Sequence, residues 1–283
     1  MEILVLGAGG MAGHVATLYF SERGHKVTSF SRTPLPYCET IVGDALNKEM
    51  LRDAVNSKPF DAVINCIGVL NKDVDMHPAD GIFLNSYLPH YISECLKDKK
   101  TKLIHLSTDC VFSGKIGGYN EKSFPESDSL YGRSKLLGEI NDSKNLTFRT
   151  SIIGPDRNEY GIGLLNWFMK ENEKVKGFTS AIWTGVSTVT LAQAIERAIE
   201  VDLCGLYHLV NNQLISKYEL LQLFNNLVRT AHIEIIADDS VYVDKSLVNN
   251  RKDFDFKVPS YEQMIKDTCD WIRSHQEYYP HYF

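Results

Sequence analysis

This 283-residue sequence has no long hydrophobic run, no secretion signal and no paired cysteines. No stretch reaches the roughly 18 consecutive apolar residues that a membrane-spanning helix needs. The first residues, MEILVLGAGG, lack the basic start and the small-residue cleavage site of a secretory signal. The six cysteines are scattered without a C-x-x-C pair, so neither a disulfide framework nor a structural zinc site is expected. We therefore expect a cytoplasmic protein with free thiols, no membrane partner and no bound metal.

A surplus of positive charge is also missing. Thirty Lys and Arg residues stand against 36 Asp and Glu residues, which gives a formal net charge of −6 at pH 7. A nucleic-acid-binding domain normally carries a basic surplus, so no nucleic-acid partner is expected. The length suits one large α/β domain or one domain with a smaller lobe.

A glycine-rich turn follows the first apolar run. Residues 3–6 are β-branched or leucine, as in a parallel strand that is buried on both faces, and a helical pattern and a second strand follow. Such a strand–turn–helix–strand unit binds a dinucleotide, because glycines let the backbone approach the pyrophosphate at the positive end of the helix. The residues that we expect to contact the dinucleotide here are Gly7, Gly9, Gly10, Met11 and Gly13.

The end of the second strand discriminates between the two nicotinamide cofactors. NAD needs an acidic residue there for the ribose 2′-OH, whereas NADP favours a cation for the 2′-phosphate. The sequence reads SFSRT and has no carboxylate, while Ser31 and Arg32 are suited to a phosphate. We therefore expect NADPH, with NADH as the alternative cofactor and a solvated loop cation as the alternative role of Arg32.

Apolar strands and helical patterns continue to alternate along the chain. Strand-like segments at 61–68, 101–107, 145–153 and 206–210 are separated by helical patterns, which predicts a doubly wound parallel sheet of the Rossmann type. We assign residues 1–154 to this dinucleotide-binding domain, with its sheet completed by 186–212. Residues 155–283 are expected to form mainly a smaller, substrate-binding lobe.

The stretch SLYGRSKLLGE carries a tyrosine and a lysine four positions apart at the start of a predicted helix. Four residues rotate about 400° along a helix, so Tyr131 and Lys135 lie on one face. The alternative is structural, because Lys135 and Glu139 also have the spacing of a surface ion pair.

Six motifs occur in order: GAGGMAG, NCIG, LNSYLP, LSTDCVFSG, YGRSK and FRTSIIGP. Together they resemble the extended short-chain dehydrogenase/reductase superfamily. Within it, the STD-x-VF-x-G pattern is similar to that of the dTDP-4-dehydrorhamnose reductase group. The resemblance covers nearly the whole chain and is tightest over residues 1–155.

The resemblance implies a catalytic set of Thr108, Tyr131 and Lys135. In such enzymes a hydride passes from the nicotinamide to a carbonyl carbon, the tyrosine protonates the developing alkoxide, and the threonine hydrogen-bonds the same oxygen. A free tyrosine has a pKa near 10. We therefore expect the Lys135 ammonium to lower the pKa of Tyr131, besides holding the nicotinamide ribose.

The same resemblance implies further cofactor contacts on the adenine side, in the cleft and beside the nicotinamide. Asp44 has an alternative role as a loop cap, and Asn65 as a turn residue. The residues in question are Asp44, Ala45, Asn65, Cys66, Gly68, Asn85 and Ile153.

For the substrate, the resemblance implies Asp109, Cys110, Trp183 and Arg251. Cys110 stands where the group usually has a tyrosine that touches the sugar, so the pocket is expected to differ there. Trp183 offers an apolar face for a 6-deoxy sugar or is a core residue. Arg251, beside Lys252, is the candidate for the nucleotide diphosphate, since arginine offers phosphate a planar fork of donors.

The expected activity is NADPH-dependent reduction of a 4-keto-6-deoxyhexose linked to dTDP or UDP. One alternative is a non-catalytic NADP-binding subunit, because the regulatory β subunit of methionine adenosyltransferase resembles the same group. Others are a UDP-linked 4-keto-6-deoxy-N-acetylhexosamine reductase or an epimerase, whereas a dehydratase would need a glutamate after Asp109. The oligomeric state is left open, with a homodimer as one alternative.

Overall fold

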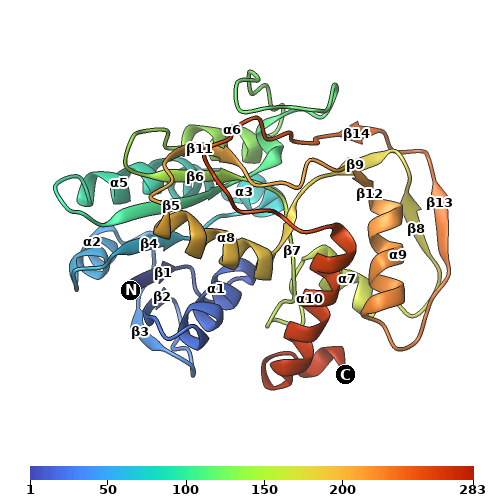
Figure 1. Cartoon of the computed structure of the whole chain (residues 1–283), viewed down its shortest axis with the longest axis horizontal. Coiled ribbons are helices and arrows are strands. Elements are labelled where there is room, and N and C mark those ends of the chain that lie inside the picture. Colours follow the sequence, from blue (N-terminus) through green and yellow to red (C-terminus); the bar gives the residue numbers. More distant parts are fainter.

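The computed structural model describes residues 1–283, and its central feature is a seven-stranded parallel sheet (Figure 1). The strand order is β11-β6-β5-β4-β1-β2-β3, so the direction of winding reverses between β1 and β4. Ligands of doubly wound sheets bind at the carboxyl ends of the strands beside such a reversal. The predicted fold class is confirmed. The strands are β1 (Glu2–Leu6), β2 (Lys26–Ser31), β3 (Glu39–Val42), β4 (Ala62–Asn65), β5 (Lys102–Ser107), β6 (Leu146–Arg149) and β11 (Gly205–His208).

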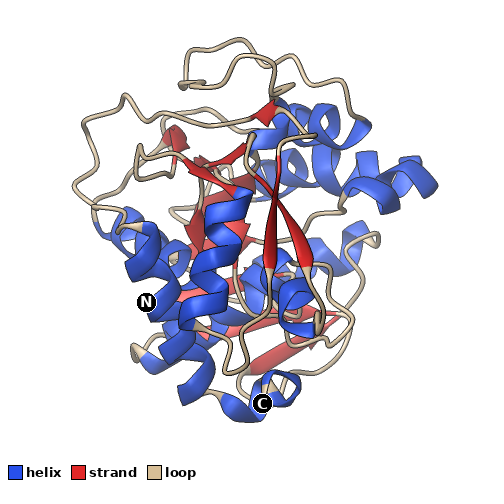
Figure 2. Ribbon diagram, turned by 90° about the vertical axis from the view of Figure 1, so that its right-hand side faces the viewer, coloured by secondary structure: helices blue, strands red, loops and turns tan.

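Helices cover both faces of this sheet (Figure 2). Strand β1 shows why, because its side chains alternate: Ile3 and Val5 pack in one core cluster, and Leu4 and Leu6 pack in another. The first cluster includes residues of α1 and α8, which pack against each other, and the second includes residues of α2 and α5. These helices are α1 (Met11–Glu22), α8 (Thr188–Glu200), α2 (Lys48–Asn56) and α5 (Leu88–Cys95).

Short helical elements surround the carboxyl edge of the sheet. The π-helix η1 leads directly into α5 and packs against α6, the helix that carries Tyr131 and Lys135. The 3-10 turn η2 follows β5 directly. Their bounds are α3 (Asn71–Met76), α4 (Pro78–Ile82), η1 (Phe83–Tyr87), η2 (Asp109–Val111) and α6 (Leu130–Leu137).

A smaller lobe of short strands and three helices lies beside the sheet, at the right in Figure 1. It contains a β8–β13 pair and a β12-β9-β14 sheet, and a β7–β10 pair precedes α8. Because α8 and β11 return to the large sheet, the division into residues 1–154 and 155–283 stays a prediction. The elements are β7 (Ile152–Ile153), α7 (Leu164–Lys170), β8 (Val175–Phe178), β9 (Ala181–Trp183), β10 (Val186–Ser187), β12 (Ile215–Ser216), α9 (Lys217–Leu227), β13 (Ile235–Asp238), β14 (Val243–Asp244) and α10 (Tyr261–Ser274).

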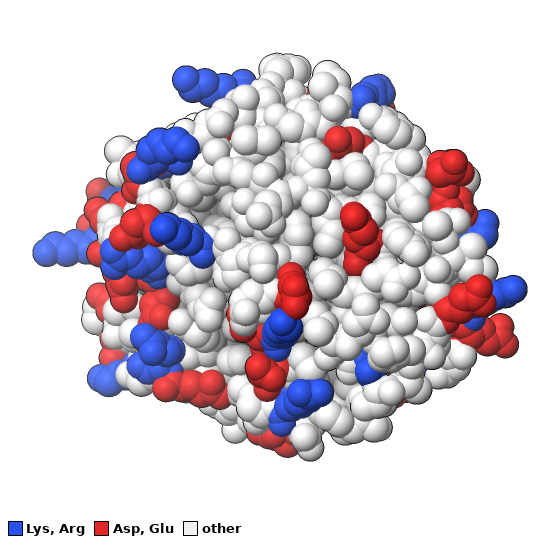
Figure 3. Space-filling model, turned by 45° about the vertical axis from the view of Figure 1, so that its right-hand side comes forward, with Lys and Arg blue, Asp and Glu red and all other residues white.

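None of the helices has the length and hydropathy required to cross a membrane. All six cysteines are free thiols. On the face shown in Figure 3, side chains of both charge signs are interspersed around the rim, and the centre is mostly uncharged.

Candidate active site

A cavity of about 630 Å³ opens at the carboxyl ends of the central strands. Its lining joins the glycine turn after β1, the segments after β4, β5 and β6, helix α6, and parts of the smaller lobe. The cavity is therefore where the reversal of strand order predicts a ligand site. The predicted residues that line it are Gly10, Met11, Cys66, Gly68, Thr108, Asp109, Cys110, Tyr131, Lys135, Ile153 and Trp183.

The glycine turn ends in a helix start that offers free amides. Gly7 adopts φ +75°, and a Cβ on Gly13 would lie 2.2 Å from the Gly7 carbonyl oxygen, so the turn and helix α1 approach closely only with glycine there. Gly10 is the N-cap of α1 and supplies no capping side chain. The amides of Met11, Ala12 and Gly13 have no acceptor within the protein, and such a helix start binds anions.

Arg32 is the free cation at the end of β2. Its side chain is exposed and takes part in no hydrogen bond or ion pair within the protein. The Ser31 hydroxyl, by contrast, donates to the Thr33 carbonyl and helps to close the loop. Of the two predicted phosphate contacts, Arg32 is the one whose side chain is unengaged.

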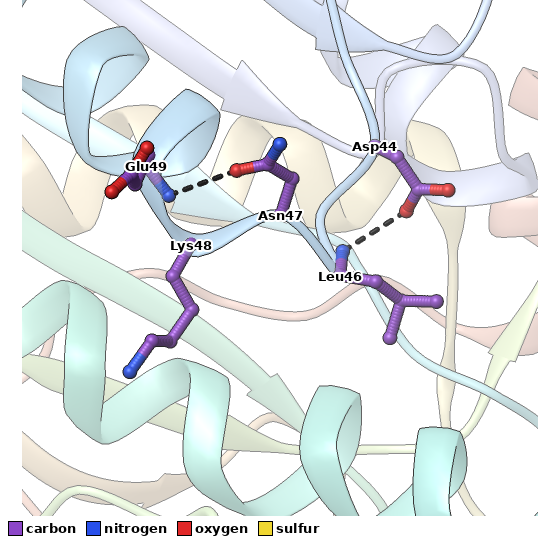
Figure 4. Close-up of a pocket in the computed structure, with 5 residues that line it drawn as sticks. All are labelled: Asp44, Leu46, Asn47, Lys48 and Glu49. Carbon is purple, nitrogen blue, oxygen red and sulfur yellow. Dashed lines mark hydrogen bonds between the residues drawn. The ribbon is translucent and has the colours of Figure 1, made fainter.

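Asp44 lies after β3, at a shallow hollow that is separate from the lining of the main cavity (Figure 4). Its neighbour Ala45 is buried and packs in the core cluster of α2 and α5. The Asp44 carboxylate accepts the Leu46 N–H at 2.9 Å, and Asn47 caps helix α2. Asp44 therefore performs the loop-cap role that was its alternative, and its adenine contact stays a prediction.

Two predicted cofactor residues shape the loop after β4 instead of facing the cavity. Asn65 accepts the Ile67 N–H and donates to His105, whereas Asn85 exchanges hydrogen bonds with the Val69 backbone and donates to Ser134. Both amides are buried and engaged within the protein. These bonds position Cys66 and Gly68 in the lining of the cavity, and the predicted cofactor contacts of Asn65 and Asn85 stay a prediction.

Thr108 begins the turn η2 directly after β5. Its hydroxyl accepts the Cys110 N–H at 3.1 Å and donates to the Asp109 carboxylate at 3.0 Å. Burial raises the pKa of Asp109, and burial together with the Asp109 charge raises the pKa of Cys110 to about 11. The Cys110 thiol is thus protonated at neutral pH and is not an activated nucleophile.

Tyr131 lies in the first turn of α6, whose N-cap Ser129 accepts the Gly132 N–H. The ring is 9% exposed and lines the cavity. Burial raises the pKa of Tyr131 above its ordinary value, the neighbouring Cys110 raises it further, and contact with Thr108 acts in the opposite direction. The prediction that Lys135 lowers this pKa is wrong here, because burial dominates. The phenol is therefore a protonated acid at neutral pH.

Lys135 projects into the same cavity one turn further along α6 and is buried. Its ammonium donates to the Leu106 carbonyl at 2.6 Å, and burial lowers its pKa to about 8. Its Nζ also lies 3.4 Å from Nε2 of His105.

His105 connects Lys135 to Asn65, and the donor and acceptor of its bond to Asn65 can be assigned. Asn65 donates to His105 Nδ1, because the other end of that amide accepts the Ile67 N–H. The neutral imidazole therefore carries its proton on Nε2, directed at Lys135. The Lys135 ammonium and this N–H are both donors, so their approach disfavours the ammonium and acts on the pKa of the lysine in the same direction as burial.

The predicted alternative of a Lys135–Glu139 ion pair is not formed. Glu139 instead binds Arg149 through two contacts of 2.6 Å, and it accepts the Ser107 hydroxyl. Both members of this pair are nearly inaccessible to solvent, and together they tie α6 to β5 and β6. Lys135 is thereby left without a carboxylate partner.

The substrate end of the cavity includes residues that the sequence did not single out. Trp183 at the end of β9 is buried, packs on Tyr261 and lines the cavity, and Lys217 lines it without any hydrogen bond or ion pair. The capping box of Ser216 and Glu219 marked Lys217 as the start of a helix, but nothing in the sequence tied that helix to the site. Further lining residues that the sequence did not single out include Asp156, Ile162, Leu164 and Trp167.

Arg251 is not at this end of the cavity, so the prediction that it binds the diphosphate is wrong. Its guanidinium donates to the carbonyls of Cys204 and Leu206 and to Asp253, and it lies over the Tyr207 ring. These partners lie around the start of β11. Arg251 is therefore at the amino ends of the parallel strands, whereas the cavity opens at their carboxyl ends. Arg251 is a structural tether, and its neighbour Lys252 is exposed.

A doubly wound sheet with a glycine turn, and with threonine, tyrosine and lysine around one cavity, defines a protein of the extended short-chain dehydrogenase/reductase class. The family model described as the RmlD substrate binding domain matches residues 1–267. The chain belongs to this family, the dTDP-4-dehydrorhamnose reductase group of that superfamily.

The proteins similar to this chain include reductases and a subunit of methionine adenosyltransferase. The chain is 25% identical over 235 residues to dTDP-4-dehydrorhamnose reductase of Aggregatibacter actinomycetemcomitans, covering 77% of this chain and 76% of the relative. It is 26% identical over 259 residues to methionine adenosyltransferase 2 subunit beta of Xenopus laevis, covering 84% and 76%. The structure resembles dTDP-4-dehydrorhamnose reductase of Bacillus anthracis in complex with NADP, with a TM-score of 0.79, 20% identity and coverage of 94% and 98%.

Proposed function

We propose that the protein is an NADPH-dependent reductase that converts the ketone of a nucleotide-linked 4-keto-6-deoxyhexose to an alcohol. The observation that carries the proposal is the convergence of Thr108, Tyr131 and Lys135 on the cavity that the glycine turn also enters. Relatives of the same group that carry the name dTDP-4-dehydrorhamnose reductase support the substrate class.

The free amides at the start of α1 fit the diphosphate of a dinucleotide, because they are unpaired donors at the positive end of a helix. The exposed Arg32 fits a 2′-phosphate, and no carboxylate occupies the end of β2 to favour NAD. When bound, NADPH supplies the hydride that reduces the carbonyl carbon.

The chain's own residues supply the proton and stabilise the negative charge on the carbonyl oxygen. The protonated Tyr131 phenol donates to this oxygen as charge develops. The Thr108 hydroxyl is the second donor once its single proton turns from the Asp109 carboxylate to this oxygen. The low pKa of Lys135 permits this group to exchange its own proton near neutral pH, which suits it to reprotonate Tyr131 through a water.

The opposite end of the cavity suits a sugar nucleotide. Trp183 and Ile162 present apolar surface, and Lys217 is an unpaired cation suited to a phosphate. Cys110 leaves more room than the tyrosine that is usual in the group, so a larger substituent on the sugar, such as an N-acetyl group, fits the proposal.

A second candidate is a cofactor-binding regulatory subunit. The similarity to methionine adenosyltransferase 2 subunit beta is as extensive as that to the reductase, and a binder can retain a catalytic set. The two candidates differ in turnover and not in cofactor binding.

The test is NADPH oxidation by the purified protein with a panel of dTDP- and UDP-linked 4-keto-6-deoxy sugars, with and without an N-acetyl group. The reductase proposal predicts turnover on at least one sugar and a product reduced at C4. NADPH binding without oxidation of any member would favour the regulatory subunit.

A further inference from the structure

Residues 275–283 form a segment beyond the part of the chain that the family model matches. They make two short 3-10 turns, η3 (Gln276–Tyr278) and η4 (Pro280–Tyr282), after α10, and lie at the bottom of Figure 1. Most of the segment is exposed or half-buried, but Tyr279 has no accessible surface. Such a large buried polar side chain needs partners for its hydroxyl, and these partners connect it to the glycine turn.

Three hydrogen bonds, here called the relay, connect Tyr279 to the glycine turn. The Trp271 indole N–H donates to the Tyr279 hydroxyl at 3.0 Å, which donates to Nε2 of His14 at 2.8 Å, and Nδ1 of His14 donates to the Gly10 carbonyl at 2.9 Å. The directions are fixed because an indole N–H only donates and a carbonyl only accepts. Burial lowers the pKa of His14 to about 4, so the imidazole is neutral and carries its one proton on Nδ1.

This relay ends at the peptide between Gly10 and Met11, two residues that line the cavity. The Gly10 carbonyl belongs to the same peptide plane as the Met11 amide, which is the first of the three free amides of α1. Gly10, Met11 and Ala12 all line the cavity. The same carbonyl also accepts the His14 backbone N–H at 3.0 Å, so the relay adds a second restraint on this peptide. Rotation of the peptide would break both bonds and turn the Met11 amide away from the cavity.

The same segment also supports two regions around the site, the lining residue Asp156 and the loop that follows Arg32. The Tyr282 hydroxyl accepts the N–H of Asp156, which lines the cavity. The Tyr278 ring packs edge-on against Tyr37, with ring centres 5.2 Å apart, and Tyr37 accepts a hydrogen bond from Arg157. Tyr37 lies in the loop that follows Arg32.

We infer that Tyr279 and His14 are positioning residues for the dinucleotide and that residues 275–283, beyond the part of the chain that the family model matches, brace the glycine turn. The inference rests on the proposed function only in requiring that the protein binds a dinucleotide. It adds that cofactor affinity depends on a segment that touches neither the cofactor cavity nor the reacting atoms.

The test compares Tyr279→Phe with a matched control, Tyr278→Phe. The first removes only the hydroxyl of the relay, and the second removes a neighbouring hydroxyl that bonds to nothing in the protein. Fluorescence titration should show the Kd for NADPH rising by roughly twofold to thirtyfold in Tyr279→Phe, the usual range for such indirect coupling. It should be unchanged in Tyr278→Phe, and kcat at saturating NADPH should be unchanged in both variants.

A double-mutant cycle separates the relay from a general loss of stability. His14→Leu breaks the same relay, so adding Tyr279→Phe to it should raise the Kd little further, whereas independent effects would multiply. Folded Tyr279→Phe with wild-type Kd, or independent effects, would overturn the inference.

A third test measures hydrogen exchange in the wild-type protein with and without NADPH. Because coupling is reciprocal, NADPH should slow amide hydrogen exchange in residues 275–283, and unchanged exchange would overturn the inference. Wild type that binds no NADPH would overturn both this inference and the proposed function. Wild type that binds NADPH and reduces no sugar would overturn the reductase proposal alone, because the relay is measured by binding.

Discussion

Arg32 is the residue on which the choice of cofactor depends. We predict that Arg32→Ala weakens NADPH binding by about 1.5–3 kcal/mol, the range for a lost hydrogen bond to a charged group. NADH affinity should not change, because NADH has no 2′-phosphate. The check is titration of both cofactors, with the exposed Arg273→Ala as the control variant. Equal losses for NADPH and NADH would contradict the assignment.

Lys135 gives a prediction for stability against pH. Its pKa is about 8 in the folded protein and about 10.5 in the unfolded chain, so between these values only the unfolded chain holds the proton. Raising the pH through this window therefore favours the folded wild type, by up to about 3 kcal/mol at about 1.4 kcal/mol per pKa unit. Lys135→Met lacks this contribution.

Urea unfolding at several pH values measures this pH-dependent contribution of Lys135 to stability. The free energy of unfolding of wild type, minus that of Lys135→Met, should rise from pH 8 to pH 10.5 and be flat below about pH 7. The exposed Lys252→Met is the control and should give a flat difference throughout. A flat difference for Lys135→Met would show that the ammonium is not destabilised by burial.

The sequence placed Thr108, Tyr131 and Lys135 together because helical spacing and motif order are local properties. It missed His105, although a histidine within an apolar strand is an unusual signal, since its partners Asn65 and Lys135 come from other elements. Arg251 was misplaced because a guanidinium suits a backbone carbonyl as well as a phosphate.

At the level of elements, the glycine turn has one position where a side chain should affect dinucleotide binding and another where it should affect folding. A Cβ on Gly10 would have the Gly7 carbonyl oxygen as its nearest neighbour at 3.5 Å, an ordinary contact, whereas a Cβ on Gly13 would lie 2.2 Å from that oxygen. We predict that Gly10→Val folds but loses dinucleotide binding, because its branched side chain fills the space at the free amides. Gly13→Val should lower the melting temperature sharply.

Thermal unfolding and NADPH titration of the two variants measure these effects. A Gly10→Val protein that is folded and binds NADPH like wild type would show that the dinucleotide does not lie on this turn.

Six strands of the large sheet were predictable because buried parallel strands are continuous apolar runs. The edge strand β3 was missed because its residues are exposed or half-buried and do not form such a run. The doubly wound parallel arrangement followed from the alternation of strands and helices, whereas the order of the strands, with β11 at the sheet edge, comes from the structure. The short strands of the smaller lobe were less predictable, because two-residue strands such as β12 are set by tertiary pairing and not by local pattern.

For the molecule as a whole, the sequence indicated one cavity at the sheet edge but not what braces it. Tyr279 and His14 are 265 positions apart, and nothing in either local pattern links them. The same limit applies to Lys217, which reaches the cavity only through the packing of the smaller lobe.

The central claim is that Tyr131 is the general acid of a reductase, and the most direct measurement is turnover by Tyr131→Phe. This change keeps the buried ring and removes the proton, so the Kd for NADPH should persist while kcat on the best sugar of the panel falls by about 10² to 10⁴. The assay is NADPH oxidation, with cofactor titration of the same preparation as the control for folding. Tyr131→Phe that turns over like wild type, with NADPH bound, would contradict the account.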